Sequence, residues 1–89
     1  MASPNGHINE VHLRGVLVRD PEVTYTGSGK PVANFTVATT YEKRAEYHRC
    51  VAWEKVAEHL GEHFKKGSFI ALAGRLQTRT FERTDRNAT

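Results

Sequence analysis

Hydrophobic residues fall at every second position along most of this chain, and at helical spacing only once. A two-residue period places side chains alternately on the two faces of a β-strand. The first such segment follows residue 8, and its apolar face consists of Val11, Leu13, Gly15 and Leu17. The same period returns in residues 32–40, 47–53 and 68–82. The sequence therefore predicts four main strands, each with one buried face.

Turn-forming residues separate these strands. Asp20-Pro21 ends the first strand, because proline cannot donate the next ladder hydrogen bond, and a short extended piece follows at 22–25. The glycines of 27–31 predict a turn before the second strand, in which Phe35 and Val37 share a face. The charged stretch 41–46 predicts a loop before the third strand.

One segment follows a helical period instead. Val56, Leu60 and Phe64 recur at intervals of four, with Ala57 beside them, which predicts a short helix with one apolar stripe. Gly67 is a natural residue to end it. In the strand that follows, the residues expected to point inward are Ile70, Leu72 and Leu76.

Three strands, one helix and a further strand form the order of an all-β (mainly β) OB-fold, a Greek-key barrel with a short helix between strands 3 and 4. The fifth strand of such a barrel is missing from the sequence, which predicts an open edge. Either the chain is a fragment, or another chain covers that edge, or the barrel is poorly closed. We expect residues 1–7 to form a flexible tail and 8–82 the OB-fold domain. Residues 83–89 would begin a frayed loop after strand 4. A domain of 89 residues has a marginal core, so help from another subunit is expected.

Composition narrows the classes of function. The net charge is only +3, and the whole excess lies in residues 61–89, with six Lys/Arg against three Asp/Glu. No apolar run approaches the ~20 residues of a membrane span, and the first residues lack the apolar core of a signal peptide. Because Cys50 is the single cysteine, an intramolecular disulfide is excluded. We expect Cys50 to be a small core residue and the protein to reside in a reducing compartment. These features predict a cytoplasmic protein.

Two predicted strand faces alternate aromatic and cationic residues. The third strand presents Tyr47, Arg49, Val51 and Trp53, and the fourth presents Arg75, Gln77, Arg79 and Phe81. Single-stranded nucleic acid needs both kinds of group, because unpaired bases stack on rings and phosphates need cations along their path. An ordinary solvated strand face has a similar composition, so the pattern alone leaves both interpretations open. If these two strands are neighbours, their rings and guanidinium groups converge on one surface.

Motifs for catalysis are weak. His59, Glu62 and His63 spell H-x-x-E-H, but a third zinc ligand is not evident, and surface histidines are expected. The segment 27–30 lacks the spacing of a phosphate loop, and Pro31 replaces the required Ser or Thr. His48 beside Cys50 is expected to be packed rather than catalytic. We therefore expect no enzyme activity, no catalytic residue, no metal and no cofactor.

At several segments the sequence resembles the bacterial single-stranded DNA-binding protein family. The resemblance runs from about residue 8 to 82 and rests on Arg19-Asp20-Pro21-Glu22-Val23, Val32-Ala33-Asn34-Phe35, Glu46-Tyr47-His48-Arg49 and Gly74-Arg75-Leu76-Gln77-Thr78-Arg79. It implies binding of single-stranded DNA without strong sequence preference, protecting it in DNA replication, repair and recombination. The DNA-binding residues that it implies are Tyr47, Arg49, Trp53, Lys55, Arg75, Arg79 and Phe81.

The resemblance also implies a homo-oligomer, a dimer of dimers paired through the first strand, in a bacterial cytoplasm at the nucleoid. Two departures stand out. Tyr41 is a weak substitute for a family tryptophan after strand 2, and the acidic tail that recruits replication and repair proteins is absent, so those partners are not expected.

The alternative function is an OB-fold protein-interaction module, primosome-like or a truncated regulatory subunit, with weak nucleic-acid binding.

Overall fold

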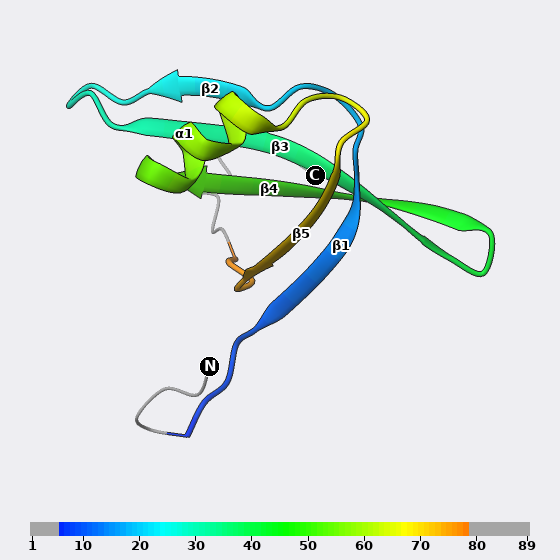
Figure 1. The fold of residues 1–89 in the computed structure, drawn as a ribbon. Coiled ribbons are helices and arrows are strands. Elements are labelled where there is room, and N and C mark those ends of the chain that lie inside the picture. The colour runs from blue at the N-terminus through cyan, green and yellow to red at the C-terminus, as the bar shows by residue number, and fades with distance from the viewer. Residues whose placement is uncertain (1–5, 79–89) are drawn as a thin grey trace, which may run out of the picture.

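The strand β3 (Pro31–Tyr41) is the centre of the sheet in the computed structural model, which describes residues 6–78 (Figure 1). Along one edge it pairs with the whole of β4 (Arg44–Trp53). Along the other edge it pairs first with β2 (Glu22–Tyr25) and then with the end of β1 (Val11–Leu17). The remainder of β1 pairs with β5 (Phe69–Gly74), and every pairing is antiparallel.

This arrangement confirms the predicted all-β OB-fold. The four predicted strands are β1, β3, β4 and β5, and the extended piece at 22–25 forms β2. The one helix, α1 (Glu54–His63), lies between β4 and β5, which are the predicted strands 3 and 4. Within residues 6–78 no strand joins β4 to β5, and β3 and β1 lie between them.

Two predicted boundaries were wrong. The stretch 41–46 is not a loop, because β3 and β4 are joined by a two-residue turn at Glu42 and Lys43, whose φ angles are 48° and 67°. Two positive φ angles give a turn whose twist matches that of the paired strands on either side. The last strand ends at Gly74 rather than near residue 82, and Leu76 is 68% exposed instead of pointing inward.

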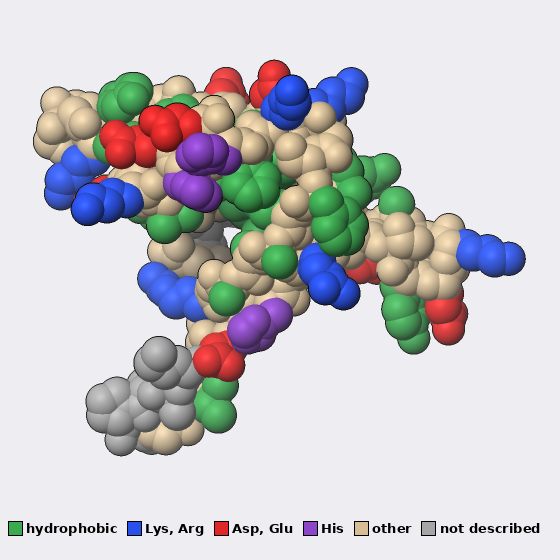
Figure 2. All heavy atoms as spheres, in the orientation of Figure 1, with side chains coloured by type: hydrophobic (Ala, Val, Ile, Leu, Met, Phe, Trp, Pro, Cys, Tyr) green, Lys and Arg blue, Asp and Glu red, His purple; other side chains and the backbone are tan. Residues whose placement is uncertain are grey.

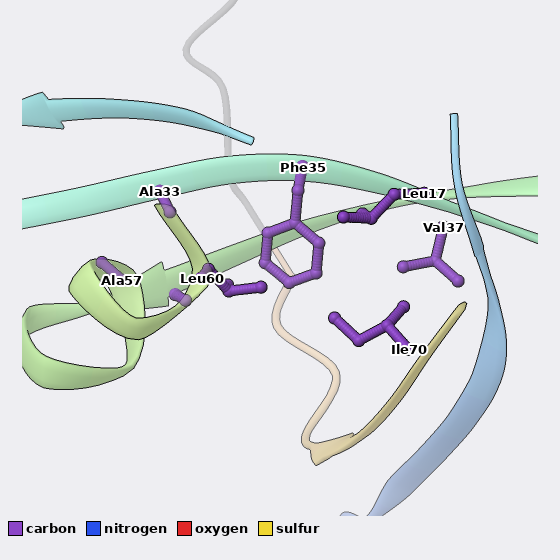
Figure 3. Close-up of a cluster of buried hydrophobic side chains, with 8 residues drawn as sticks. Leu17, Ala33, Phe35, Val37, Ala57, Leu60 and Ile70 are labelled. Carbon is purple, nitrogen blue, oxygen red and sulfur yellow. The ribbon is translucent and has the colours of Figure 1, made fainter. Parts of the chain in front are cut away.

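The core fills the space between the curved sheet and α1 (Figure 3). Its buried members are Leu17, Ala33, Phe35, Val37, Ala52, Ala57, Leu60 and Ile70. From α1 the buried residues are Ala57 and Leu60, with Phe64 half-buried, so the stripe follows steps of three and four residues. Val56 was wrongly assigned to that stripe and is 61% exposed. Gly67 does not end the helix, which stops at His63. Gly67 has φ of 90° and lies in the turn closed by the Ser68 N–H donating to the Lys65 carbonyl at 2.9 Å.

Two glycines allow close approaches that hold this arrangement together. A side chain at Gly15 would collide with the backbone carbonyl of Ala38, where β1 crosses β3. A side chain at Gly61 would lie 2.9 Å from Cγ2 of Val23, so glycine lets α1 pack against β2. Both positions fix how the strands and the helix close around the core.

Candidate nucleic-acid interface

The outer face of β3–β4 is the surface turned away from the core and from α1. On β4 it carries Tyr47, Arg49, Val51 and Trp53, all exposed, as the two-residue period predicted. Directly opposite on β3 lie Ala38, Thr36, Asn34 and Val32. The β3 side chains are smaller, so the two rings and the guanidinium group of β4 stand above their neighbours on β3.

A shallow depression at one end of this face contains Tyr47 and Arg49 together with a second cationic side chain, Arg19. Its lining consists of Val18, Arg19, Thr36, Tyr47 and Arg49. The Val18 N–H donates to the Thr36 carbonyl at 3.2 Å, which extends the contact of β1 with β3 and carries Arg19 to this surface. Arg19 was not among the predicted site residues. It follows β1 and precedes Asp20-Pro21, and local sequence patterns gave no signal that it lines the same depression as Tyr47.

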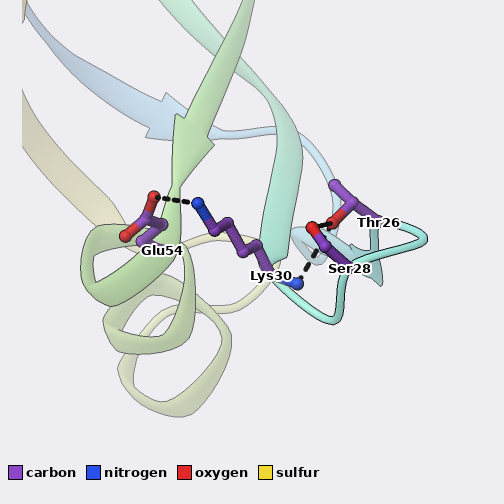
Figure 4. A network of polar contacts seen from close by, with 4 residues as sticks. All are labelled: Thr26, Ser28, Lys30 and Glu54. Atoms are coloured by element: carbon purple, nitrogen blue, oxygen red, sulfur yellow. Dashed lines mark hydrogen bonds and ion pairs between the residues drawn. The ribbon is translucent and has the colours of Figure 1, made fainter.

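The opposite end of the face lies where β4 gives way to α1. Trp53 is the last residue of β4, and Lys55 is exposed in the first turn of α1. Glu54 lies between them, and its Oε2 is 3.9 Å from Nζ of Lys30, which reaches over from the β2–β3 turn (Figure 4). This end therefore combines one large ring with two lysines and one carboxylate.

The predicted contribution of the last strand is placed differently. Arg75 is exposed just beyond β5 and lines an open depression with Asn9, Glu10, His12 and Ala73, away from the outer face of β3–β4. Within residues 6–78 the prediction that these two strands are neighbours was wrong, since β3 and β1 lie between β4 and β5 in the sheet. Arg79 and Phe81 lie outside the described residues.

On the side of the molecule where α1 lies, basic residues are distributed rather than concentrated. Figure 2 shows the side of the molecule on which α1 lies, where Lys and Arg side chains are scattered among acidic and apolar ones. That distribution agrees with the small net charge of +3. On that side, attraction of a polyanion would therefore depend on individual side chains more than on one large basic patch.

The histidines and the cysteine lie elsewhere. His48 and Cys50 are half-buried on the inner side of β4, where Nε2 of His48 is 2.9 Å from Oγ1 of Thr39. Burial raises the pKa of the Cys50 thiol, so it is protonated and a poor nucleophile at neutral pH. On α1 the rings of His59 and His63 are 4.5 Å apart between centroids. Among residues 6–78 no three His, Cys, Asp or Glu side chains gather as a metal site would require.

The comparisons with known proteins agree with this geometry. Residues 8–89 match the Single-strand binding protein family. The chain belongs to that family. No helix in the described part of this family member is long and apolar enough to cross a membrane.

Individual relatives support the assignment to the single-strand binding protein family. The chain is 41% identical over 85 residues to a "Single-stranded DNA-binding protein" of Halalkalibacterium halodurans, covering 88% of this chain and 51% of that protein. It is 42% identical over 82 residues to "Single-stranded DNA-binding protein A" of Bacillus subtilis, covering 84% of this chain and 48% of that protein. The chain thus spans about half the length of the curated relatives it matches.

Proposed function

We propose that this chain binds single-stranded DNA without strong sequence preference and performs no chemistry on it. The observation that carries the proposal is the outer face of β3–β4, on which Tyr47, Arg49 and Trp53 stand exposed in one row. The names of the relatives support the same ligand. They do not favour the alternative of a protein-interaction module.

The mechanism follows from the order of side chains along β4. Tyr47 and Trp53 offer flat faces to two bases, each stacked base contributing roughly 1–3 kcal/mol. The two rings are six residues apart, which corresponds to about 20 Å of extended strand. Arg49 between them, and Arg19 beside Tyr47, supply charge for the phosphates that link the bases. Stacking is sequence-tolerant because every base has a π-face.

Four further residues complete the proposed binding surface. Lys55, exposed in the first turn of α1, would contact a phosphate beyond Trp53. Arg75, with Arg79 and Phe81, would engage DNA that continues past β1 and β5, and this part of the site remains a prediction. We propose 8–82 as the DNA-binding domain of a cytoplasmic, nucleoid-associated protein acting in replication, repair and recombination.

We also propose that the chain self-associates through β1 and β5. Val16 and Phe69 lie opposite each other on the outward face of that pair, and Phe69 is 67% exposed. An apolar pair open to solvent on two adjacent strands is typical of a surface that pairs with another subunit. A homo-oligomer, such as a dimer of dimers, would cover it.

The test compares two tyrosines of the same hairpin on opposite faces. Tyr47 is 66% exposed on the outer face, and Tyr41 is 71% exposed at the inner position opposite Arg44. Tyr47→Ala should weaken binding of fluorescent oligo-dT by roughly 1–3 kcal/mol, and Tyr41→Ala should leave it unchanged. Absence of salt-sensitive binding by the unmodified chain at micromolar concentration would contradict the proposed function.

A further inference from the structure

We infer that Glu54 masks a phosphate contact of the DNA-binding surface: it is the exchangeable counter-ion of Lys30 at the Trp53 end of β4 until a phosphate replaces it. This inference rests on the proposed function and names one more phosphate contact, Lys30, together with the residue that controls it. Neither residue belongs to the aromatic and cationic row on β4.

The backbone of Lys30 is anchored in the turn between β2 and β3. Its N–H donates to Oγ1 of Thr26 at 3.1 Å, and its carbonyl accepts from the Thr26 N–H at 2.9 Å. The Gly29 N–H donates to the Thr26 carbonyl at 2.8 Å, and the hydroxyls of Thr26 and Ser28 are 3.1 Å apart (Figure 4). A lysine on a turn fixed in this way has a defined starting point for its side chain.

The direction of that side chain places its charge at the end of the aromatic row. Lys30 precedes Val32 by two residues, and Val32 lies opposite Trp53 in the β3–β4 ladder. Figure 4 shows the Lys30 side chain crossing from the turn to Glu54, the residue that follows Trp53. The ammonium group is therefore held at the residue that directly follows Trp53 in the chain, where a strand stacked on Trp53 would bring a phosphate under the proposed function.

The Lys30–Glu54 ion pair is exposed and weak, so Lys30 can exchange Glu54 for another anion. The two side chains are 61% and 60% exposed and their charged atoms are 3.9 Å apart. An exposed pair at this distance is weakly stabilising, because water and salt screen it. A DNA phosphate offers the same charge as the Glu54 carboxylate, so Lys30 can pass from one to the other at little cost. Until then, Glu54 neutralises Lys30 and lowers its attraction for polyanions.

The experiment measures oligo-dT affinity over a salt series for the full chain with Glu54→Gln, Lys30→Gln and the double substitution. Glu54→Gln should tighten binding by about 2- to 5-fold at low salt, because Lys30 no longer has to leave a carboxylate to contact a phosphate. It should also steepen the salt slope by up to about 0.7, because no freed carboxylate takes up a salt cation when DNA binds. Adding Lys30→Gln should remove that gain entirely. Lys30→Gln should therefore cost more affinity in the Glu54→Gln background than alone.

Glu62→Gln is the matched control, since it removes the same charge from α1 two turns further along, where Glu62 pairs with His63 at 3.7 Å. It should change the slope far less than Glu54→Gln, and thermal melts should show that every variant is folded.

An equal gain from Glu62→Gln would overturn the inference and indicate a general charge effect. So would a gain that survives Lys30→Gln. If the unmodified chain binds but Glu54→Gln changes nothing, only the inference fails; if the unmodified chain does not bind, the proposed function fails with it.

Discussion

Asn9 and Leu76 are joined by two hydrogen bonds although they lie 67 residues apart in the chain. Nδ2 of Asn9 donates to the Leu76 carbonyl, and the Leu76 N–H donates to Oδ1 of Asn9, both at 2.9 Å. The side-chain amide thus pairs with the backbone as a neighbouring strand would, two residues beyond the end of β5. It holds the segment that contains Arg75 against the start of β1.

Replacing Asn9 with alanine should release this segment. Each lost hydrogen bond is worth roughly 0.5–1.5 kcal/mol, and both partners are exposed, so the effect on global stability should be at the low end. The local effect should be clear in hydrogen exchange, where the Leu76 amide should exchange several-fold faster. Asn34→Ala, on the outer face of β3, is the control and should leave Leu76 protected. Unchanged protection of Leu76 in Asn9→Ala would show that other contacts hold the segment.

The depression around Tyr47 gives a second prediction. Arg19→Gln and Arg49→Gln should each lower the salt slope of oligo-dT binding by about 0.7, if each guanidinium contacts one phosphate of a single strand. Arg44→Gln removes the same charge from the same hairpin, but Arg44 lies opposite Tyr41 on the other face. Its slope should stay that of the unmodified chain. Equal slopes for Arg44→Gln and Arg49→Gln would argue that charge alone, without position, governs binding.

The face of each strand could be predicted because the two-residue period is a local property. Val11 to Leu17, Phe35 with Val37, and Tyr47 to Trp53 all point as their alternation required. The limits of elements were harder to predict. Leu76 continues the two-residue period of Ile70 and Leu72, which predicts an inward side chain. The partner strand β1 begins at Val11, opposite Gly74, so residues after Gly74 have no strand with which to pair. Tertiary pairing, rather than pattern, ends β5.

Which elements meet could not be predicted from alternation at all. Arg19 lines the same depression as Tyr47 because β1 crosses β3 at Gly15, a contact between segments far apart in sequence. The same crossing places β1 and β3 between β4 and β5 in the sheet, so the strand that precedes Arg75 is not a neighbour of the strand that ends at Trp53. On α1, Val56 and Ala57 are adjacent, and only the position of β3 decides that Ala57 is the buried one.

Gly15 gives a prediction about stability. A methyl group there would meet the Ala38 carbonyl and would lie 3.1 Å from Cγ1 of Val37, so β1 must move away from β3. Gly15→Ala should destabilise the fold by about 1–3 kcal/mol or more, because overpacking against backbone is poorly relieved. Gly74→Ala is the matched control in β5, where an added Cβ would have nothing within 4 Å. Chemical denaturation should show a loss for Gly15→Ala alone; similar losses for both would contradict the crossing as the cause.

Cys50 gives a prediction about pH. It lies opposite Phe35 on the inner face of β4, and burial raises the pKa of its thiol from the ordinary 9.0. The folded protein therefore keeps this proton to higher pH than the unfolded chain does. The contribution of Cys50 to stability is complete below the ordinary pKa and is lost as pH rises through the folded one. Denaturation under reducing conditions should show a steeper fall above about pH 8.5 for the unmodified chain than for Cys50→Ala, in which this thiol cannot titrate. The altered packing in Cys50→Ala adds a constant offset to its free energy of unfolding. If the two curves of this free energy against pH run parallel apart from that offset, the thiol has the same pKa in the folded and the unfolded chain.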